Sequence, residues 1–319
     1  MGKIHKPRAS SLQYWPRKRT SKILPRVNWQ PLEQKYSEKK GILGFIAYKV
    51  SNARVLANDL TPDSMTKGKQ IILPVTVLES PSLKILSVRF YKNNQISTEV
   101  LADNLDKELK HLIKIPKTKS SLAEIEKNLH NYDSIRLIVY TQVKKTEKKK
   151  TPDLIEIGLS GTLQEKLEFA KNYLGKEMNL SDFFTSNHLV DIRGVTKGYG
   201  LCGPVHRHGI ALKAHKSEKG VRRPGNLSPW HPSRVTFHAP MAGQMGFFKR
   251  THYNQKIIDL GPASKLPLEF KNYGKIKTNY IVILGSIQGP SKRQVILTNP
   301  LRETKKTLKK NYEIVKILN

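Results

Sequence analysis

The sequence has few of the residues on which disulfide-bonded, metal-binding and membrane proteins depend. Its one cysteine, Cys202, allows no intramolecular disulfide and no cage of thiolate ligands. No apolar run reaches the roughly 18 residues of a membrane-spanning helix. The N-terminal stretch has no apolar segment either, so we expect no secretory signal there. These absences predict a cytoplasmic protein without a bound metal or cofactor.

Acidic residues are scarce as well. Asp and Glu total 25 against 57 Lys and Arg, which gives a formal net charge of +32. A folded chain with this excess repels itself unless a polyanion neutralises it, and nucleic acid is the commonest such partner. An acidic membrane surface is the alternative, but the basic residues are not confined to one juxtamembrane or helical stripe. The charge balance therefore favours a nucleic-acid partner.

Residues 1–40 differ in composition from the rest of the chain. They hold eleven Lys or Arg, two Glu and four prolines, at positions 7, 16, 25 and 31. Prolines at this spacing interrupt both helical and strand patterns, and the apolar residues are scattered. The segment is predicted to be an extended basic arm, disordered by itself in water.

Short apolar runs begin at Gly41. They have the length of strands, are rich in Ile, Val, Tyr and Phe, and are bounded by Gly, Pro, Asn or Ser. With no regular helices between them, they predict an antiparallel β-barrel with α insertions, a mainly β fold of the α+β type. The predicted strands lie within residues 41–50, 72–78, 83–91, 134–140, 279–287 and 293–299.

Two helices are expected to interrupt the strands. Ser121-Leu-Ala-Glu124 and Thr162-Leu-Gln-Glu165 both match the capping-box pattern, and Leu, Ile and Ala follow each at helical spacing, including Leu129 after the first. A third, weaker helix is expected within 103–112. The run KKTEKKK at 144–150 is predicted to be a solvated loop.

The stretch from 191 to 256 has an unusual composition. It contains twelve Lys or Arg, two acids, nine of the twenty glycines and six of the ten histidines, with almost no apolar periodicity. Such a segment buries no core, and a structureless loop of this length is unusual inside a compact domain. We expect an extended finger that is ordered by phosphates and bases outside the protein.

The predicted parts of the whole chain are a basic N-terminal extension (1–40), the first part of the barrel (41–95), a helical insertion (96–150), a barrel return with a helix (151–195), the finger (196–256), and final strands with a C-terminal tail (257–319).

Two motifs within the finger suggest other chemistry. Gly198-Tyr-Gly200-Leu-Cys-Gly203 fits the dinucleotide-binding pattern, but Pro204 follows directly and the expected acid about twenty residues later is missing. Cys202 with the nearby histidines suggests zinc, but His206 and His208 are only two residues apart. No carboxylate is placed to orient a Cys–His nucleophile. Neither motif is therefore expected to bind a cofactor or metal, or to catalyse a reaction.

The same segment has the side chains of an RNA-binding surface. Arg forks bind phosphate in a bidentate manner and stack on bases, while Trp and Phe offer flat faces for stacking. The alternative for the aromatic residues is that they hold the finger folded. The residues concerned are Arg222, Arg223, Arg234, Lys249, Arg250, Trp230, Phe247 and Phe248.

Three segments occur in the order and spacing of a known family: GVTKGYGLCGPVHRHGI (194–210), RRPGNLSPWHPSRV (222–235) and AGQMGFFKRTHYNQKIIDLG (242–261). Flanking segments agree, namely PVTVLESP (74–81), KKKTPDLIEIGLSG (148–161), NYG (272–274) and GSIQGPSKR (285–293). With them the chain resembles the universal large-subunit ribosomal protein family "L three" over nearly its whole length from Gly41. Its length, arm and helical insertion are similar to the archaeal and eukaryotic form, and we favour the archaeal one.

This resemblance implies a structural protein of the large ribosomal subunit, and not an enzyme. It implies a translation-protein-type barrel and a finger that passes through ribosomal RNA toward the peptidyl transferase centre. It also implies binding near the 3′ end of the large rRNA, an early part in subunit assembly, and other large-subunit proteins as neighbours. The residues expected to bind rRNA, from the resemblance and from their chemistry, are Arg8, Arg17, Lys18, Arg19, Lys197, Arg207, His208, Lys213, His215, Lys216, Arg222, Arg223, Trp230, His231, Arg234, Gln244, Arg250 and His252.

The chain departs from the family pattern at a few positions. The usual K-G-K-G reads Lys197-Gly-Tyr199-Gly, the usual Trp after Lys-Arg is His208, and a usual Tyr-His pair is Phe247-Phe248. An early A-G-M-T-like stretch is replaced by residues 50–53. These changes affect individual contacts rather than the resemblance. The alternative function is a basic nucleic-acid-binding protein that does not belong to the ribosome, which would share the charge but has no need of the finger.

Overall fold

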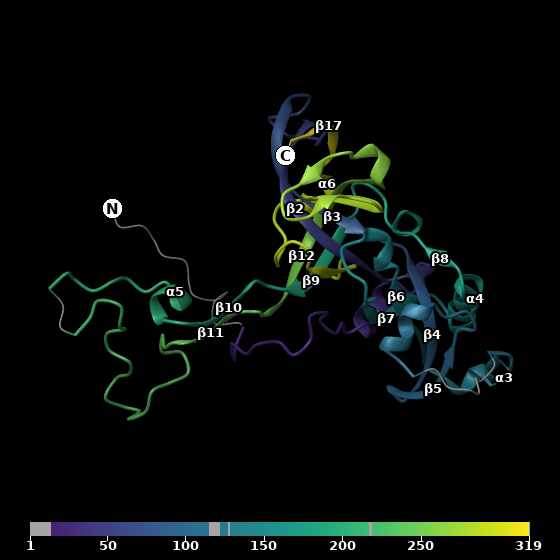
Figure 1. The fold of residues 1–319 in the computed structure, drawn as a ribbon, viewed down its shortest axis with the longest axis horizontal. Helices are drawn as coiled ribbons and strands as arrows, with labels where there is room; N and C mark the ends of the chain where they lie inside the picture. The colour runs from purple at the N-terminus through teal and green to yellow at the C-terminus, as the bar shows by residue number, and fades with distance from the viewer. Residues whose placement is uncertain (1–13, 115–121, 127, 217–218, 319) are drawn as a thin grey trace. The chain divides into compact units, whose positions relative to one another are not determined.

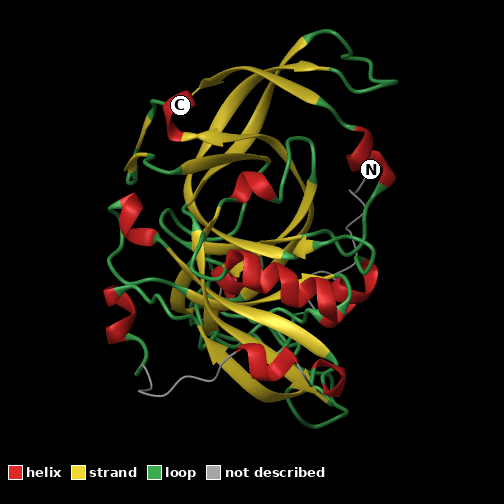
Figure 2. Cartoon of the chain, turned by 90° about the vertical axis from the view of Figure 1, so that its right-hand side faces the viewer, coloured by secondary structure: helices red, strands yellow, loops and turns green. Residues whose placement is uncertain are grey.

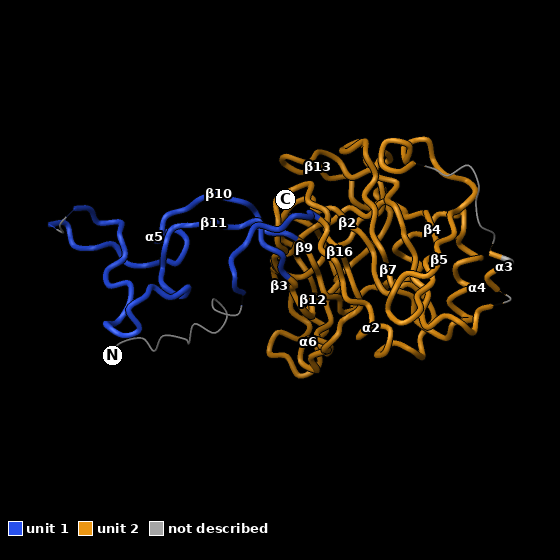
Figure 3. The backbone as a smooth tube through the Cα atoms, turned by 90° about the horizontal axis from the view of Figure 1, so that it is seen from below, with its two compact units in different colours: residues 1–23, 195–250 blue, residues 24–194, 251–319 orange. Residues whose placement is uncertain are grey.

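The computed structural model describes residues 14–114, 122–126, 128–216 and 219–318. The chain divides into two compact units (Figure 3). Unit 1 comprises residues 1–23 and 195–250, and unit 2 comprises residues 24–194 and 251–319. The chain thus leaves unit 2 after Gly194 and returns to it at Thr251.

Unit 2 contains a seven-stranded sheet with the order β16-β9-β12-β15-β3-β2-β17. Because β16 also pairs with β2, six of these strands pair in a closed ring. Strand β17 pairs with residues 54–59 of β2, on the edge opposite β3 and beyond the stretch of β2 that pairs with β16. Figure 2 shows how strongly these strands curve. The strands are β2 (Gly44–Asp59), β3 (Gln70–Ser80), β9 (Leu189–Val195), β12 (Lys249–Pro262), β15 (Asn279–Leu284), β16 (Gln294–Thr298) and β17 (Tyr312–Leu318).

Strand β15 shows why this sequence forms a sheet that is buried on both faces. Successive side chains of a strand point to opposite faces of the sheet, so the apolar residues of β15 face two different sides in turn. Ile281 and Ile283 belong to the larger core, while Tyr280 and Val282 belong to a second core lined by residues of β2, β3 and β12. Four consecutive apolar residues are therefore all buried in one strand.

A second sheet of six strands shares the larger core, and its order is β1-β7-β6-β4-β5 with β8 on β4. Two further strand pairs occur among the described residues. Strand β13 pairs with β14 in unit 2, and β10 pairs with β11 in unit 1, where Figure 1 labels both strands. Their bounds are β1 (Gly41–Ile42), β4 (Leu83–Lys92), β5 (Gln95–Leu101), β6 (Ser134–Thr141), β7 (Leu154–Ser160), β8 (Glu177–Met178), β10 (Gly198–Cys202), β11 (Gly243–Gly246), β13 (Glu269–Phe270) and β14 (Gly274–Lys275). The prediction of a mainly β fold with α insertions is confirmed.

The helix predicted after Thr162 is confirmed as α4 (Leu163–Tyr173), the longest helix described. The Thr162 hydroxyl accepts a hydrogen bond from the Glu165 amide, and the Glu165 carboxylate accepts one from the Thr162 amide, so two free N–H groups at the helix start are satisfied. Leu167 and Ala170 are the buried apolar residues on one face of α4.

The other predicted helices are shorter than expected. The one after Ser121 is α3 (Leu122–Glu126), and Leu129 lies in a separate 3-10 turn, η2 (Leu129–Asn131). Its capping residue Ser121 lies outside the described residues. The third is the single 3-10 turn η1 (Lys107–His111). The remaining helical segments are α2 (Gln30–Lys35), η3 (Val143–Thr146), η4 (Leu180–Asp182), α5 (Pro204–His208), η5 (Ala263–Lys265) and α6 (Lys305–Lys309).

The prediction that residues 1–40 form no helix is wrong at α2. Pro31 falls in the first turn of α2, where its missing N–H costs no hydrogen bond and its fixed φ suits a helix. Trp29, just before the helix, is 2% exposed and donates its indole N–H to the Glu156 carbonyl at 3.0 Å. On the helix, Glu33 forms an ion pair with Arg136, with 3.0 Å between the Glu33 Oε1 and Arg136 Nε atoms. The end of the predicted arm is thus part of the core of unit 2.

The segment 144–150 is also more ordered than a solvated loop. It begins within η3, whose Val143 and Thr146 are buried. Lys148 and Lys149 are half-buried, whereas Lys144 and Lys145 remain exposed. The Lys-rich composition gave little sign of this packing. Of the two buried side chains, Val143 precedes the run, and Thr146 is the one uncharged residue inside it.

We predict that Trp29→Ala lowers the free energy of unfolding by about 3–5 kcal/mol, since it removes a buried aromatic side chain and leaves a cavity. The Trp29 ring lies where a Cβ at Gly44 or Gly158 would stand, and glycine at these two positions has no side chain to fill the space. Urea denaturation of the full chain provides the measurement. Trp230→Ala is the matched control, since Trp230 is 87% exposed. Equal stability of the two variants would contradict the packing of α2.

Candidate nucleic-acid interface

The charge of the chain is concentrated in unit 1. This unit holds 17 of the 57 Lys and Arg residues but one of the 25 Asp and Glu residues, although it contains about a quarter of the chain. The one acid, Glu218, lies outside the described residues. The described part of unit 1 therefore offers no carboxylate to its own cations.

The framework of unit 1 is the antiparallel pair β10–β11 followed by the short helix α5. Gly246 lies at φ +71°, and a Cβ there would stand 2.0 Å from the Lys197 carbonyl oxygen, so the close approach of the two strands requires glycine. The Phe247 amide donates to the same carbonyl at 2.9 Å. The glycine pattern at 198–203 is thus a strand of this pair. It leads into a helix of five residues, not into the long helix of a dinucleotide-binding fold.

Arg207 holds the framework together from within. Its Nε donates to the Gln244 carbonyl and its Nη1 to the Met241 carbonyl, both at 3.0 Å. A Cβ at Gly243 would stand 2.9 Å from the guanidinium carbon, so the glycine makes room for this group. Gln244 in turn donates its amide to the Gly246 carbonyl at 3.0 Å. Two residues that were predicted to bind rRNA are thus engaged with backbone groups of unit 1.

Residues 14–21 pack on this framework through aromatic and cationic side chains. Trp15 stacks on His208 with ring centroids 6.2 Å apart and planes 17° apart, and it meets Phe237 edge-on at 5.6 Å. Arg17 lies over the Trp15 ring at 5.0 Å and donates to the Arg207 carbonyl. The position at which the family usually has Trp is therefore covered by an aromatic ring from the N-terminal segment.

The segment between α5 and β11 is the most exposed part of unit 1. Apart from residues 217–218, which are not described, it consists of turns and extended chain without a helix or strand. Trp230 is held edge-on to His231 at a centroid distance of 6.4 Å. The predicted site residues that are exposed are Lys18, Arg19, Lys197, Lys213, His215, Lys216, Arg222, Arg223, Trp230, His231, Arg234 and, in unit 2, His252.

The remaining predicted site residues are less accessible. Arg17, Arg207, His208, Gln244 and Arg250 are half-buried, and Arg8 lies outside the described residues. Tyr14 and Trp15 were not among the residues predicted to bind rRNA. In the structure they lie beside Arg250 and Arg17, respectively. The run YWPRKR at 14–19 holds the signal, because aromatic rings next to Arg and Lys are typical of single-stranded RNA-binding segments.

The side chains considered for zinc are used otherwise. The Cys202 thiol donates to the Tyr199 carbonyl at 3.6 Å, His206 meets the Tyr199 ring edge-on, and His208 stacks on Trp15. Within the described ranges, no three His, Cys, Asp or Glu side chains are grouped to hold a metal ion. Within the same ranges, no helix has both the length and the apolar character needed to cross a membrane.

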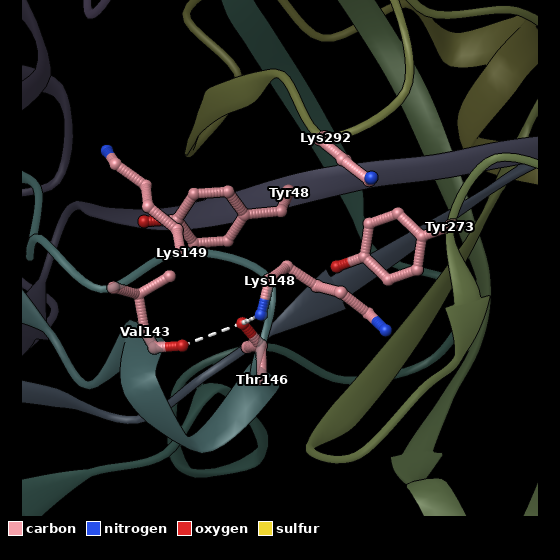
Figure 4. Close-up of a pocket in the computed structure, with 7 residues that line it drawn as sticks. All are labelled: Tyr48, Val143, Thr146, Lys148, Lys149, Tyr273 and Lys292. Atoms are coloured by element: carbon pink, nitrogen blue, oxygen red, sulfur yellow. Dashed lines mark hydrogen bonds between the residues drawn. The ribbon is translucent and has the colours of Figure 1, made fainter.

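A small cavity in unit 2 has a different character. Its volume is about 120 Å³. Figure 4 shows the lining, which consists of Tyr48, Tyr273, Val143, Thr146 and three lysines. Lys149 pairs with Asp153 at 2.5 Å, and Asp153 also accepts the Tyr48 hydroxyl at 2.5 Å. Tyr273 donates to the buried Glu79 at 2.5 Å.

The two tyrosines of this cavity remain protonated. Burial raises the pKa of Tyr48, and the charge of Asp153 raises it further. Burial and the charge of Glu79 raise the pKa of Tyr273 in the same way. Both hydroxyls therefore stay hydrogen-bond donors to carboxylates, and neither supplies a nucleophile near neutral pH. The group is a buried polar network that joins strands of unit 2.

We predict that Gly246→Ala opens the β10–β11 pair, because its Cβ would overlap the Lys197 carbonyl and its φ is unfavourable for alanine. The expected local cost is about 1–3 kcal/mol, seen as faster hydrogen exchange of amides in both strands. Gly225→Ala is the matched control in the same unit, since no atom lies within 4 Å of its Cβ position. Unchanged exchange in Gly246→Ala would show that the strands do not approach in this way.

Comparison with known proteins gives a consistent match. The family model described as ribosomal protein L3 matches residues 1–317. Large ribosomal subunit protein uL3 of Methanocaldococcus jannaschii is 36% identical to this chain over 320 residues, covering 96% of the chain and 94% of that protein. The protein of the same name from Methanosphaera stadtmanae is 37% identical, covering 96% and 95%. That of Archaeoglobus fulgidus is also 37% identical, covering 95% and 94%.

Proposed function

The chain belongs to the ribosomal protein L3 family of the large ribosomal subunit, and we propose on that premise that it is a structural constituent of the subunit that binds rRNA chiefly through unit 1. Its relatives are archaeal proteins named for the same subunit, so its place is the cytoplasmic ribosome. Large-subunit rRNA and neighbouring ribosomal proteins are its partners.

The concentration of cations in unit 1 carries this proposal. Seventeen Lys and Arg residues against one acid leave the unit strongly self-repelling, and its described residues contain no carboxylate to relieve the repulsion. RNA phosphates relieve it, and the release of their counterions favours binding. The exposed Arg222, Arg223 and Arg234 suit phosphate, because the guanidinium forms paired hydrogen bonds with phosphate oxygens.

The exposed segment 209–242 is the outer part of the finger, residues 196–256, in this proposal. It has little apolar surface to bury, and Trp230 is exposed although tryptophan is usually well covered. An exposed aromatic ring within a basic segment suits stacking on an RNA base. The finger then passes into rRNA, with Trp230, His231 and Arg234 nearest the peptidyl transferase centre, as the family resemblance implies. Binding near the rRNA 3′ end and an early part in assembly follow from the same resemblance.

Unit 2 is the part that folds by itself. Its strand pairings close in a ring, which supports a barrel of the translation-protein type. It also pairs its charges internally, for example Arg136 with Glu33 and Glu156. The proposed function needs no general acid, base or nucleophile, because unit 1 acts through charge neutralisation, stacking and shape.

Deletion of residues 211–240 should leave unit 2 folded but prevent stable incorporation into large subunits. Far-ultraviolet circular dichroism and thermal unfolding test the fold, and co-sedimentation with large subunits through a high-salt wash tests incorporation. The intact chain is expected to stay with the subunits through the wash. Loss of the intact chain in high salt would instead favour a free nucleic-acid-binding protein, and global unfolding of the deletion variant would contradict the independence of unit 2.

A further inference from the structure

A cavity of about 480 Å³ lies within unit 1 between two segments distant in sequence. Residues 14–21 form one side of it, and Phe248, Lys249 and Arg250 form the other. The volume falls within the range of about 300–1,000 Å³ typical of small-ligand sites. It is thus large enough for a substituted ring. The residues that line it determine which chemical class of ligand it can bind.

One wall is a stack of flat groups. The Arg250 guanidinium lies 4.1 Å from the centroid of the Tyr14 ring and 5.0 Å from that of the Phe248 ring. Phe248 is buried, whereas Tyr14 is 42% exposed, so the stack is fixed at one end and open at the other. An exposed ring that is backed by a guanidinium offers its free face to another flat group.

All charged groups of the lining are cationic. Arg17, Lys18, Arg19 and Lys249 line the cavity together with Arg250, and none of the described lining residues is acidic. The other residues of the lining are Trp15, Pro16, Thr20 and Ser21. Five positive charges around one space select an anion. In contrast, the lysine-lined cavity of unit 2 has Asp153 paired to one of its lysines. The two properties together, a flat stacking face and a lining whose charges are all positive, match a nucleotide.

Contacts within the protein hold the walls in place. The Thr20 amide donates to the Phe247 carbonyl at 3.0 Å, and the Thr196 amide donates to the Phe248 carbonyl at 3.0 Å. Arg19 lies over the Phe247 ring at 5.1 Å. Such prior ordering reduces the entropy lost on binding.

Trp15, one of the lining residues, has an indole N–H that is buried without a hydrogen-bond acceptor among the described residues. A buried donor without an acceptor is unfavourable and marks a place where a bound group or water completes the structure.

We propose that this cavity receives a single unstacked nucleotide of large-subunit rRNA, whose base stacks on Tyr14 and whose phosphate lies among Arg17, Lys18, Arg19 and Lys249. The inference rests on the proposed function, since it names one site within the rRNA interface. It assigns the residues 14–21 a base-recognising part, in addition to the charge that the sequence predicts for them.

The test uses the full chain and its cognate large-subunit rRNA. Tyr14→Ala removes the stacking face, and Tyr14→Phe is the matched control that keeps the ring. We expect Tyr14→Ala to weaken rRNA binding roughly tenfold, and Tyr14→Phe to bind as the unchanged chain does. The dependence of log Kd on log salt should be the same in all three, because no phosphate contact is lost.

Chemical probing of base edges in the three complexes locates the nucleotide. One unpaired rRNA nucleotide should be protected by the unchanged chain and by Tyr14→Phe, and exposed with Tyr14→Ala. Identical protection and affinity in all three complexes would overturn the inference while leaving rRNA binding intact. A lower salt slope in Tyr14→Ala would also overturn it, by showing that the segment contributes phosphate contacts alone. Failure of the unchanged chain to bind this rRNA would instead refute the proposed function.

Discussion

Repulsion among the Lys and Arg side chains of unit 1 is the constraint on which this molecule depends. Within the protein it is moderated by carbonyl oxygens and aromatic faces: Arg207 donates to two carbonyls, and Arg17 and Arg250 lie over rings. These contacts place the cations but do not cancel their charge. Cancellation needs a polyanion, and large-subunit rRNA is the polyanion that the proposed function supplies.

Unit 2 handles charge in the opposite way. Its cations pair with carboxylates, as Arg89 on β4 does with Glu99 on β5 at 2.7 Å, and Lys84 with Asp106 at 3.3 Å. Its two larger apolar cores lie on opposite faces of strands such as β15. The chain thus combines a unit stabilised by its own core with a unit whose exposed segment has almost no core residues. Half of the net charge of +32 thus falls in unit 1, which is about a quarter of the chain, while the larger unit 2 contains the hydrophobic interior.

The predictable features were those set by local pattern. Strands with alternating or continuous Val and Ile, and the capping box at Thr162, follow from neighbours in sequence. The helix α2 could not be predicted from its sequence neighbours, because Trp29 is buried through contacts with the distant Gly44, Gly158 and Glu156. In unit 1 the charge predicts an interface with nucleic acid. It could not show that Arg207 binds carbonyls across the β10–β11 framework, or that Tyr14 meets Arg250, since both depend on chain segments brought together by folding.

The salt dependence of rRNA binding tests the central role of unit 1 most directly. Replacing Arg222 and Arg223 by Gln should reduce the slope of log Kd against log salt by about 1.5, since each phosphate contact contributes roughly 0.7–0.9. Lys144→Gln with Lys145→Gln is the matched pair in unit 2, where both lysines already pair with Glu108 and Glu177. That pair should leave the slope unchanged. Equal slopes for the two double variants would contradict the account.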